Sequence, residues 1–395
     1  MKKIIVLFLI LSNVSFAQKN PFGEVKVSSK KYYEEISFTT VVDKIIIPVE
    51  IKGKTYRFFV DTGAPNAISP QVFEELNLEE IQKPEKPFLI PISDANNLTD
   101  SLRLVNLPPL KIGNTSFENT KGMLIDFENN YMMKCLKIDG IIGSNLFVNS
   151  VVKFSMKNKK IYITESVKNL NSKTKGTKLS LINAQSMPFI KVNFLGKEDK
   201  KANEILLVDS GASGFYDVSK RAFEILNPND FYGTVSQAEG LGGLGMYENT
   251  KSEIQNLVTI PSFMINRMSF ENVQAVTTND RNSRIGIQVL DYGDMILDFK
   301  KKKFYYESFS DKVIFDENRK IEISILEGNL IVGLVWDEKL KQIMSYGNKI
   351  LRIDDLEFKD FCDFIAIKEY LLNKKSYEIE FLNNKNEKVI VTLNN

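Results

Sequence analysis

Two short acidic motifs carry the residue types in this sequence that could do chemistry. Asp61 closes an apolar stretch in Arg57–Ala64 (RFFVDTGA), and Asp209 closes another in Ile205–Ala212 (ILLVDSGA). A carboxylate at the end of a buried strand is costly unless it is paired or neutralised. Two carboxyl groups brought face to face cannot both ionise, so they hold one proton between them. One then serves as a base and the other as an acid, which can activate water and protonate a leaving amine.

The residues that follow each acid fit such a pair. Gly63 and Gly211 allow the chain to turn sharply and to approach its counterpart closely. Thr62 and Ser210 supply hydroxyl groups that can bond the opposite loop and fix the geometry. The apolar residues before each acid lower the local dielectric, which favours retention of the shared proton.

The composition excludes several other kinds of catalytic and metal site. The chain has no histidine, which excludes Ser-His-Asp and Cys-His catalysis and zinc sites that need imidazole. We expect no metal and no cofactor. The net charge of +2 gives no reason to expect a nucleic-acid partner. Cys135 and Cys362 lie far apart, and we expect two free buried thiols rather than a disulfide, although export would permit one.

The two acidic motifs belong to an internal repeat. Leu107–Asn119 (LPPLKIGNTSFEN) aligns without a gap with Ile260–Asn272 (IPSFMINRMSFEN), and Gly140–Ile163 aligns more loosely with Ser283–Tyr306. Each half reads in the same order: acidic motif, short helix, middle hairpin, SFEN, Ile-Gly and a final strand pair. We interpret this as a duplication of one fold within the chain.

Most apolar runs are short and bounded by turn residues, which predicts a mostly β protein. Short helices are expected at Ser69–Leu78, Val218–Asn227 and Asp360–Asn373. Ser69 and Ser219 are candidate N-caps of the first two.

These motifs make the sequence resemble the aspartic proteases. Residues 61–64 (DTGA) and 209–212 (DSGA) are similar to the two catalytic motifs of that family, and the alanine in fourth position is closer to its retropepsin-like branch. Ile141–Gly143 is similar to the apolar-apolar-Gly element that packs behind each catalytic loop, whereas Arg284–Gly286 departs from it at the arginine.

The resemblance covers about residues 45–306. It implies a bilobal aspartic-protease β-barrel fold with two pseudo-symmetric lobes, an Asp61/Asp209 catalytic dyad and a polypeptide substrate. Either motif alone could be an Asp that caps its own turn. Ala64 and Ala212 lack hydroxyls that would bond the outer carboxylate oxygens, so we expect a less depressed pKa and an activity optimum from weakly acidic to near-neutral pH.

The resemblance also implies a β-hairpin flap over the cleft. Ala238–Thr250 occupies the matching place in the second half, and its glycines suit a mobile hairpin, although a plain surface loop is an alternative. The flap glycines would be Gly240, Gly242, Gly243 and Gly245. The matching stretch of the first half, Ile90–Leu104, has no glycine and no tyrosine of the kind that pepsin carries there.

Residues 1–17 read as a signal peptide, with Lys2 and Lys3 before a short apolar core and cleavage after Ala17. An N-terminal strand or anchor is the alternative. No later stretch is long and apolar enough to span a bilayer. We therefore expect an exported protein, periplasmic or extracellular, with lobe 1 in residues 18–165 and lobe 2 in residues 179–310.

Residues 312–395 follow a different pattern. Gly347–Asp354 (GNKILRID) resembles a segment common in bacterial PDZ domains, which implies a small α/β PDZ-like domain and a peptide ligand bound by strand addition. The alternative is a small cap that packs on the second lobe.

Two other functions remain open at this point. A catalytically inactive relative would bind extended peptides without cutting them. A structural envelope β-protein would lack a cleft that joins the two acidic loops. The separation of the Asp61 and Asp209 carboxyl groups distinguishes the last of these from an enzyme, because a working pair must lie within hydrogen-bonding range.

Overall fold

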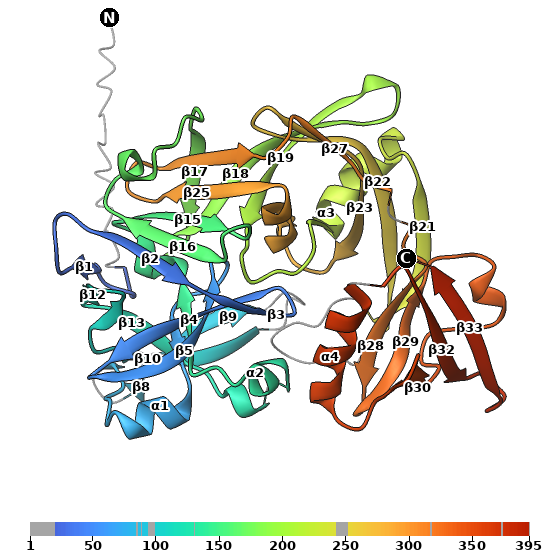
Figure 1. Cartoon of the computed structure of the whole chain (residues 1–395), viewed down its shortest axis with the longest axis horizontal. Helices are drawn as coiled ribbons and strands as arrows, with labels where there is room; N and C mark the ends of the chain where they lie inside the picture. Colours follow the sequence, from blue (N-terminus) through green and yellow to red (C-terminus); the bar gives the residue numbers. More distant parts are fainter. Residues whose placement is uncertain are drawn as a thin grey trace, which may run out of the picture.

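The computed structural model describes residues 20–83, 86–87, 89–93, 99–129, 131–241, 252–316, 318–372 and 374–394. It is mostly β, as the sequence predicts, and consists of two lobes and a smaller C-terminal domain (Figure 1). The predicted signal peptide lies outside the described residues. Within the described ranges, no helix is long and apolar enough to cross a membrane.

The first lobe is a curled sheet. Its strands are β1 (Lys26–Val27), β3 (Thr39–Val41), β4 (Lys44–Ile51), β5 (Lys54–Asp61), β6 (Ala67–Ile68), β9 (Leu89–Ser93), β10 (Thr99–Asn106), β11 (Leu110–Ile112), β12 (Thr115–Glu118), β13 (Lys121–Leu124) and β14 (Gly140–Gly143). Their order is β1-β12-β11-β4-β5-β14-β6-β13-β10-β9, with β3 beside β4. β7 (Gln82–Lys83) pairs antiparallel with β8 (Lys86–Pro87), and the helices are α1 (Pro70–Glu75) and α2 (Tyr131–Leu136).

The second large sheet forms the other lobe and the seam between the two. Its strands are β2 (Tyr33–Ser37), β15 (Val151–Ser155), β16 (Lys160–Thr164), β17 (Thr177–Ile182), β18 (Met187–Leu195), β19 (Lys201–Val208), β20 (Tyr216–Ser219), β21 (Val235–Gly240), β22 (Glu253–Ile265), β23 (Met268–Thr278), β24 (Arg284–Ile285), β25 (Gly293–Asp298), β26 (Lys303–Ser308) and β27 (Lys312–Ile314). Their order is β2-β16-β15-β25-β26-β17-β18-β19-β24-β20-β23-β22-β21, with β27 beside β23. The helix of this lobe is α3 (Lys220–Leu226).

A run of neighbouring strands in one lobe corresponds one to one with a run in the other. The run β4-β5-β14-β6-β13-β10-β9 of the first lobe matches β18-β19-β24-β20-β23-β22-β21 of the second. In both, the strand that leads into the acidic motif pairs in parallel with the Ile-Gly strand. The predicted helix caps are also present, because the hydroxyls of Ser69 and Ser219 accept hydrogen bonds from the N–H groups of Val72 and Ala222. The repeat seen in the sequence is therefore a repeat of topology.

The lobes are joined by the last strand pair of each half. β15 pairs antiparallel with β25, so that Val151–Phe154 faces Met295–Asp298 across the seam. Apolar side chains from both lobes form one continuous core across this junction, which includes Phe154 and Leu297. A shared core of this kind holds the two acidic loops in a fixed relation to each other.

The C-terminal domain has its own core. Its strands are β28 (Ile321–Leu326), β29 (Asn329–Val335), β30 (Ile350–Ile353), β31 (Leu356–Glu357), β32 (Ser376–Leu382) and β33 (Lys388–Asn394), and its helix is α4 (Phe361–Leu372). β28 pairs with β29, and the other strands form a sheet in the order β31-β30-β32-β33. Lys312–Ile314, which falls in the range predicted for this domain, instead pairs with β23 of the second lobe. Whether the domain is PDZ-like stays a prediction.

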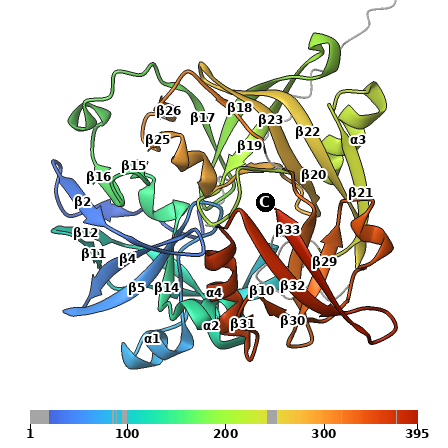
Figure 2. The ribbon, with the colours of Figure 1, turned by 45° about the vertical axis from the view of Figure 1, so that its right-hand side comes forward.

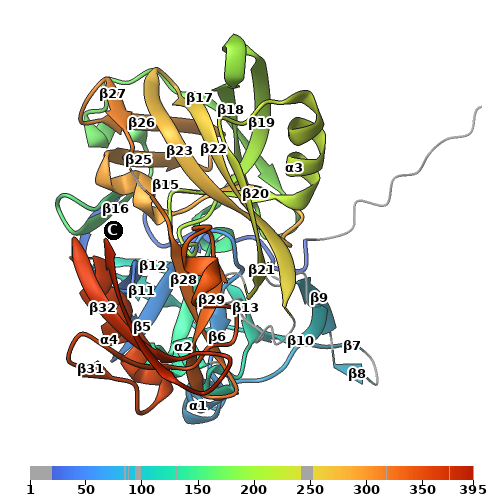
Figure 3. The same cartoon turned by 90° about the vertical axis from the view of Figure 1, so that its right-hand side faces the viewer.

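The C-terminal domain contacts both lobes. Toward the second lobe, β29 runs beside β21 (Figure 3), where Leu241 N–H donates to the Gly333 carbonyl at 3.2 Å. Leu334 and Trp336 pack there against Ala238. Toward the first lobe, α4 lies beside α2 (Figure 2).

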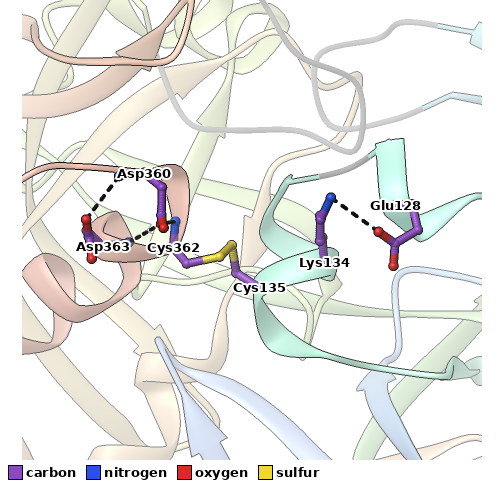
Figure 4. The surroundings of a disulfide bond; sticks show 6 residues. All are labelled: Glu128, Lys134, Cys135, Asp360, Cys362 and Asp363. Carbon is purple, nitrogen blue, oxygen red and sulfur yellow. Dashed lines mark hydrogen bonds and ion pairs between the residues drawn. A yellow bond between two sulfur atoms is a disulfide. The ribbon is translucent and has the colours of Figure 1, made fainter.

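A disulfide joins α2 to α4, so the prediction of two free thiols is wrong. The sulfur atoms of Cys135 and Cys362 are bonded, and the two residues are 227 positions apart in the sequence (Figure 4). The docking of the C-terminal domain on the first lobe brings the two helices together. The bond spans a domain boundary, which is why neither helix alone indicates it.

Replacement of Cys362 by Ser is expected to lower the free energy of unfolding by about 2–4 kcal/mol, because the bond closes a long loop. Denaturant unfolding with and without a thiol reductant measures this. Reductant should bring the wild-type protein down to the stability of the variant and leave the variant unchanged. Equal stability of oxidised and reduced wild-type protein would contradict the prediction.

Candidate active site

The two acids lie at equivalent places in the two lobes. Asp61 is the last residue of β5 and is aligned with Gly143 of the neighbouring parallel strand β14. Asp209 directly follows β19, and its N–H donates to the Ile285 carbonyl of β24 at 3.0 Å. In each lobe a strand therefore delivers its acid to a turn that lies against the Ile-Gly element.

The hydroxyls of Thr62 and Ser210 connect the two turns in a reciprocal pattern. Thr62 Oγ1 donates to the Val208 carbonyl at 2.6 Å, and Ser210 Oγ donates to the Val60 carbonyl at 2.9 Å. In return, Ser210 N–H donates to Thr62 Oγ1 at 2.9 Å, and Thr62 N–H donates to Ser210 Oγ at 3.0 Å. Both side chains are buried, so each polar group depends on the opposite lobe for its partner.

The glycines of the two motifs place the carboxyl groups next to each other. Gly63 N–H donates to Asp61 Oδ1 at 2.8 Å, and Gly211 N–H donates to Asp209 Oδ1 at 2.9 Å. Each glycine also packs against the acid of the other lobe. A Cβ atom at Gly63 would lie 2.9 Å from Asp209 Cγ, and one at Gly211 would lie 2.4 Å from Asp61 Cγ. The four residues thus form a crossed arrangement in which the two acids face one another.

This arrangement changes the ionisation of Asp61. Burial, followed by the negative charge of Asp209, raises the pKa of Asp61 to about 8. A hydrogen bond between the two carboxyl groups acts in the same direction, whereas the Gly63 N–H and the Lys44 ammonium act against it. The Asp61 carboxyl therefore holds a proton at neutral pH, as a pair that shares one proton requires.

Two cations beside the acids were not identified as site residues from the sequence. Lys44, at the start of β4, is buried, and its Nζ donates to the Gly211 carbonyl and, at 3.1 Å, to Ser213 Oγ. Burial lowers the pKa of Lys44, and the charges of Asp209 and Asp61 oppose this shift. In the sequence, the one feature that could have drawn attention to Lys44 is its place as a charged residue at the start of the apolar strand KIIIPVEI.

The second cation is Arg284, on β24. Its Nη1 lies 3.8 Å from Asp209 Oδ2. In the sequence, Arg284 was visible as a departure from an apolar pattern, but its role beside the acid depends on the fold.

Part of the predicted flap lies within the described residues. Gly242, Gly243 and Gly245 lie outside the described residues. Gly240 ends β21, and its close contacts are with Gly333 and Leu334 of the C-terminal domain. In the first lobe, β9 and β10 pair as a hairpin in the stretch that matches a flap, with residues 94–98 between them outside the description.

Metal-ligating side chains do not gather into a site within the described residues. Across the part of the chain that the structure describes, no group of three or more His, Cys, Asp or Glu residues could hold a metal ion.

Comparisons with known proteins find similarity to aspartic proteases. Residues 47–146, which include Asp61 but not Asp209, match a family model described as aspartyl protease. No curated protein matches the chain. One similar solved structure is a retropepsin-like aspartic protease from Rickettsia conorii, with 15% identity, 36% of this chain and 93% of that chain covered, and a TM-score of 0.22. Another is an aspartic proteinase from Irpex lacteus, with 12% identity, 71% and 98% covered, and a TM-score of 0.41.

Proposed function

We propose that this chain is an aspartic endopeptidase that hydrolyses peptide bonds of a polypeptide through a water molecule activated by Asp61 and Asp209. One observation carries the proposal: each motif glycine packs against the carboxyl group of the opposite lobe, so two acids remote in the sequence form one pair. Thr62, Gly63, Ser210 and Gly211 hold that pair through the hydrogen bonds described above.

The chemistry follows from a pair that carries one proton. The ionised carboxylate takes a proton from water as the water oxygen bonds to the substrate carbonyl carbon, and the protonated carboxyl gives its proton to the carbonyl oxygen. The neutral diol then breaks its C–N bond. The carboxyl that took the proton from water passes it to the leaving nitrogen, while its partner recovers a proton from a diol hydroxyl. The pair ends in its starting state, and no metal or cofactor takes part.

The pH range follows from the same pair. A pair with one proton exists between its two ionisation steps. Because the pKa of Asp61 is raised to about 8, the upper limit of activity is expected near that pH, and the optimum is expected in weakly acidic to neutral solution.

The disulfide supports an exported location. Bonds such as Cys135–Cys362 form and persist in oxidising compartments, such as the periplasm or the extracellular space. Removal of residues 1–17 with cleavage after Ala17 is part of this proposal, and N-terminal sequencing of the exported protein should begin at Gln18.

The contact of β29 with β21 favours a role of the C-terminal domain as a cap on the second lobe. A peptide ligand for this domain remains a weaker proposal, because part of β29 already contacts Leu241 of the same chain.

The test is hydrolysis of an unfolded protein by the purified chain. Mass spectrometry should find new internal chain ends, and pepstatin, which mimics the tetrahedral intermediate, should block their formation. A protein that binds extended peptides but leaves them intact after long incubation would be a catalytically inactive relative. A protein that neither binds nor cuts would favour a structural role.

A further inference from the structure

We propose that Arg284 decides which acid is the base: its guanidinium keeps Asp209 ionised, to take the proton from water, and leaves the shared proton on Asp61. Arg284 is thus a positioning residue that acts through Asp209. This inference rests on the proposed function, and it assigns separate roles to two acids that the motifs alone make equivalent.

The position of Arg284 is fixed by two other acids. Its side chain is 12% exposed, and its Nε bonds Asp217 Oδ2 at 2.9 Å. Its Nη1 pairs with Asp280 Oδ2 at 3.2 Å, and the same Nη1 lies 3.8 Å from Asp209 Oδ2. Asp217 stands directly opposite Arg284 on β20. A guanidinium held from two sides has little freedom to move away from Asp209, so its charge is a permanent part of the site.

The two oxygens of Asp209 have different partners. Oδ1 accepts hydrogen bonds from the N–H groups of Gly211 and Ala212, at 2.9 and 3.2 Å. Oδ2 faces the guanidinium of Arg284 at ion-pair distance, beyond hydrogen-bond length. Both sets of contacts favour the charged carboxylate.

The first lobe has an apolar residue where the second has this cation. Arg284 is aligned with Leu207, two positions before Asp209, and Ile141 is aligned with Phe59, two positions before Asp61. Ile141 is 3% exposed and belongs to an apolar cluster. The two lobes therefore differ at this position. Only the lobe of Asp209 has a cation there, which favours ionisation of Asp209 over ionisation of Asp61.

Other charges near the pair do not reverse this asymmetry. Lys44 acts on both carboxyl groups, because both charges influence its own pKa. It contacts Gly211 O and Ser213 Oγ of the loop that follows Asp209, so it too lies on that side of the pair. The carboxylates of Asp217 and Asp280 offset part of the charge of Arg284, and Asp280 shares Nη1 with Asp209, but the guanidinium is the only one of these three groups whose charge is opposite to that of an ionised Asp209.

Replacement of Arg284 by Gln tests the assignment, with Arg284→Lys as the control that keeps the charge. Glutamine can place an N–H donor where Arg284 Nε stands beside Asp217, but it removes the cation and does not reach the place of Nη1 beside Asp280. Both limbs of the pH profile of kcat/KM should then move to higher pH by about one unit, because a carboxyl pair without its cation holds its protons more tightly. At pH values well below the midpoint of the wild-type acidic limb, the activity of the Gln variant should fall about tenfold, while the Lys variant should keep the limbs of the wild-type profile.

A uniform loss of activity in Arg284→Gln, with both limbs in place, would overturn the inference and leave Arg284 a structural residue. A second measurement does not need this variant to fold or any variant to cut. Carboxyl carbon NMR of Asp61→Asn and Asp209→Asn proteins should find Asp209 ionised over a wider range of acidic pH than Asp61. Equal titration of the two acids would refute the inference while the dyad stands. Wild-type protein that does not cleave would instead refute the proposed function.

Discussion

Replacement of Asp209 by Asn is expected to lower kcat/KM for an unfolded protein by about 10³-fold or more, and Asp61→Asn is expected to do the same. Asparagine has the shape of aspartate but neither takes a proton from water nor gives one up. The cross-lobe hydrogen bonds of Thr62 and Ser210 use backbone and hydroxyl groups, so they remain in both variants. The folded structure should persist while the proton transfers are lost.

Initial rates with a quenched peptide and with an unfolded protein measure the loss. Asp230→Asn is the matched control, because this exposed acid pairs at the surface with Lys197 at 2.9 Å and with Lys200 at 3.8 Å. The control should keep wild-type activity. Full activity in either dyad variant would remove the chemical basis of the proposal, since the chain offers no histidine to take over the role.

Asp61→Asn should also change how stability depends on pH. The pKa of Asp61 is raised to about 8, so the folded state binds a proton that the unfolded state releases near pH 4. The contribution of Asp61 to the free energy of unfolding is therefore full below pH 4, and it is lost as the pH rises from about 4 to about 8. The variant lacks this loss, so its midpoint of urea unfolding should fall less than that of the wild-type protein between pH 5 and pH 8.

The meeting of the two acidic turns could be predicted from the sequence because its determinants are local and occur twice. An apolar strand, an acid, a hydroxyl and a glycine form a strand-to-turn unit, and two such units in the same order of elements imply a symmetric meeting point. The strand orders of the lobes bear out that repeat. The helix caps at Ser69 and Ser219 were predictable for the same reason, because each depends on its own first turn.

Features that depend on packing between distant parts were not predictable in this way. The Cys135–Cys362 bond depends on how the C-terminal domain docks on α2. Lys44 reaches the second lobe from a strand of the first, and nothing near it in the sequence indicates its partners. The strand Lys312–Ile314 also lies beside β23 because of tertiary contacts, although the change of pattern near residue 310 suggested a boundary there. In each case the feature depends on a contact between two segments that lie far apart in the sequence, and the local sequence of neither segment indicates the other.

Replacement of Gly211 by Ala is expected to lower kcat/KM by about 10²-fold, because the added methyl group occupies space that the Asp61 carboxyl needs. The new Cβ would lie 2.4 Å from both Cγ and Oδ2 of Asp61, well inside contact distance. Asp61 is held by the Gly63 N–H at 2.8 Å, so it can move only if that bond is disturbed. A displacement of about 1 Å in a catalytic group costs about 10²-fold in rate.

Two other glycines make this prediction specific to the dyad. At Gly63 the added Cβ would lie 2.9 Å from Asp209 Cγ, a milder overlap, so Gly63→Ala should lose less activity than Gly211→Ala. At Gly233, in the same lobe as Gly211, the nearest atom would be 3.4 Å away, and Gly233→Ala should keep wild-type kcat/KM. Rates are compared per folded molecule, with the folded fraction taken from urea unfolding. If Gly211→Ala were as active as Gly233→Ala, the loop of the second lobe would not touch the acid of the first, and the two carboxyl groups could not share a proton.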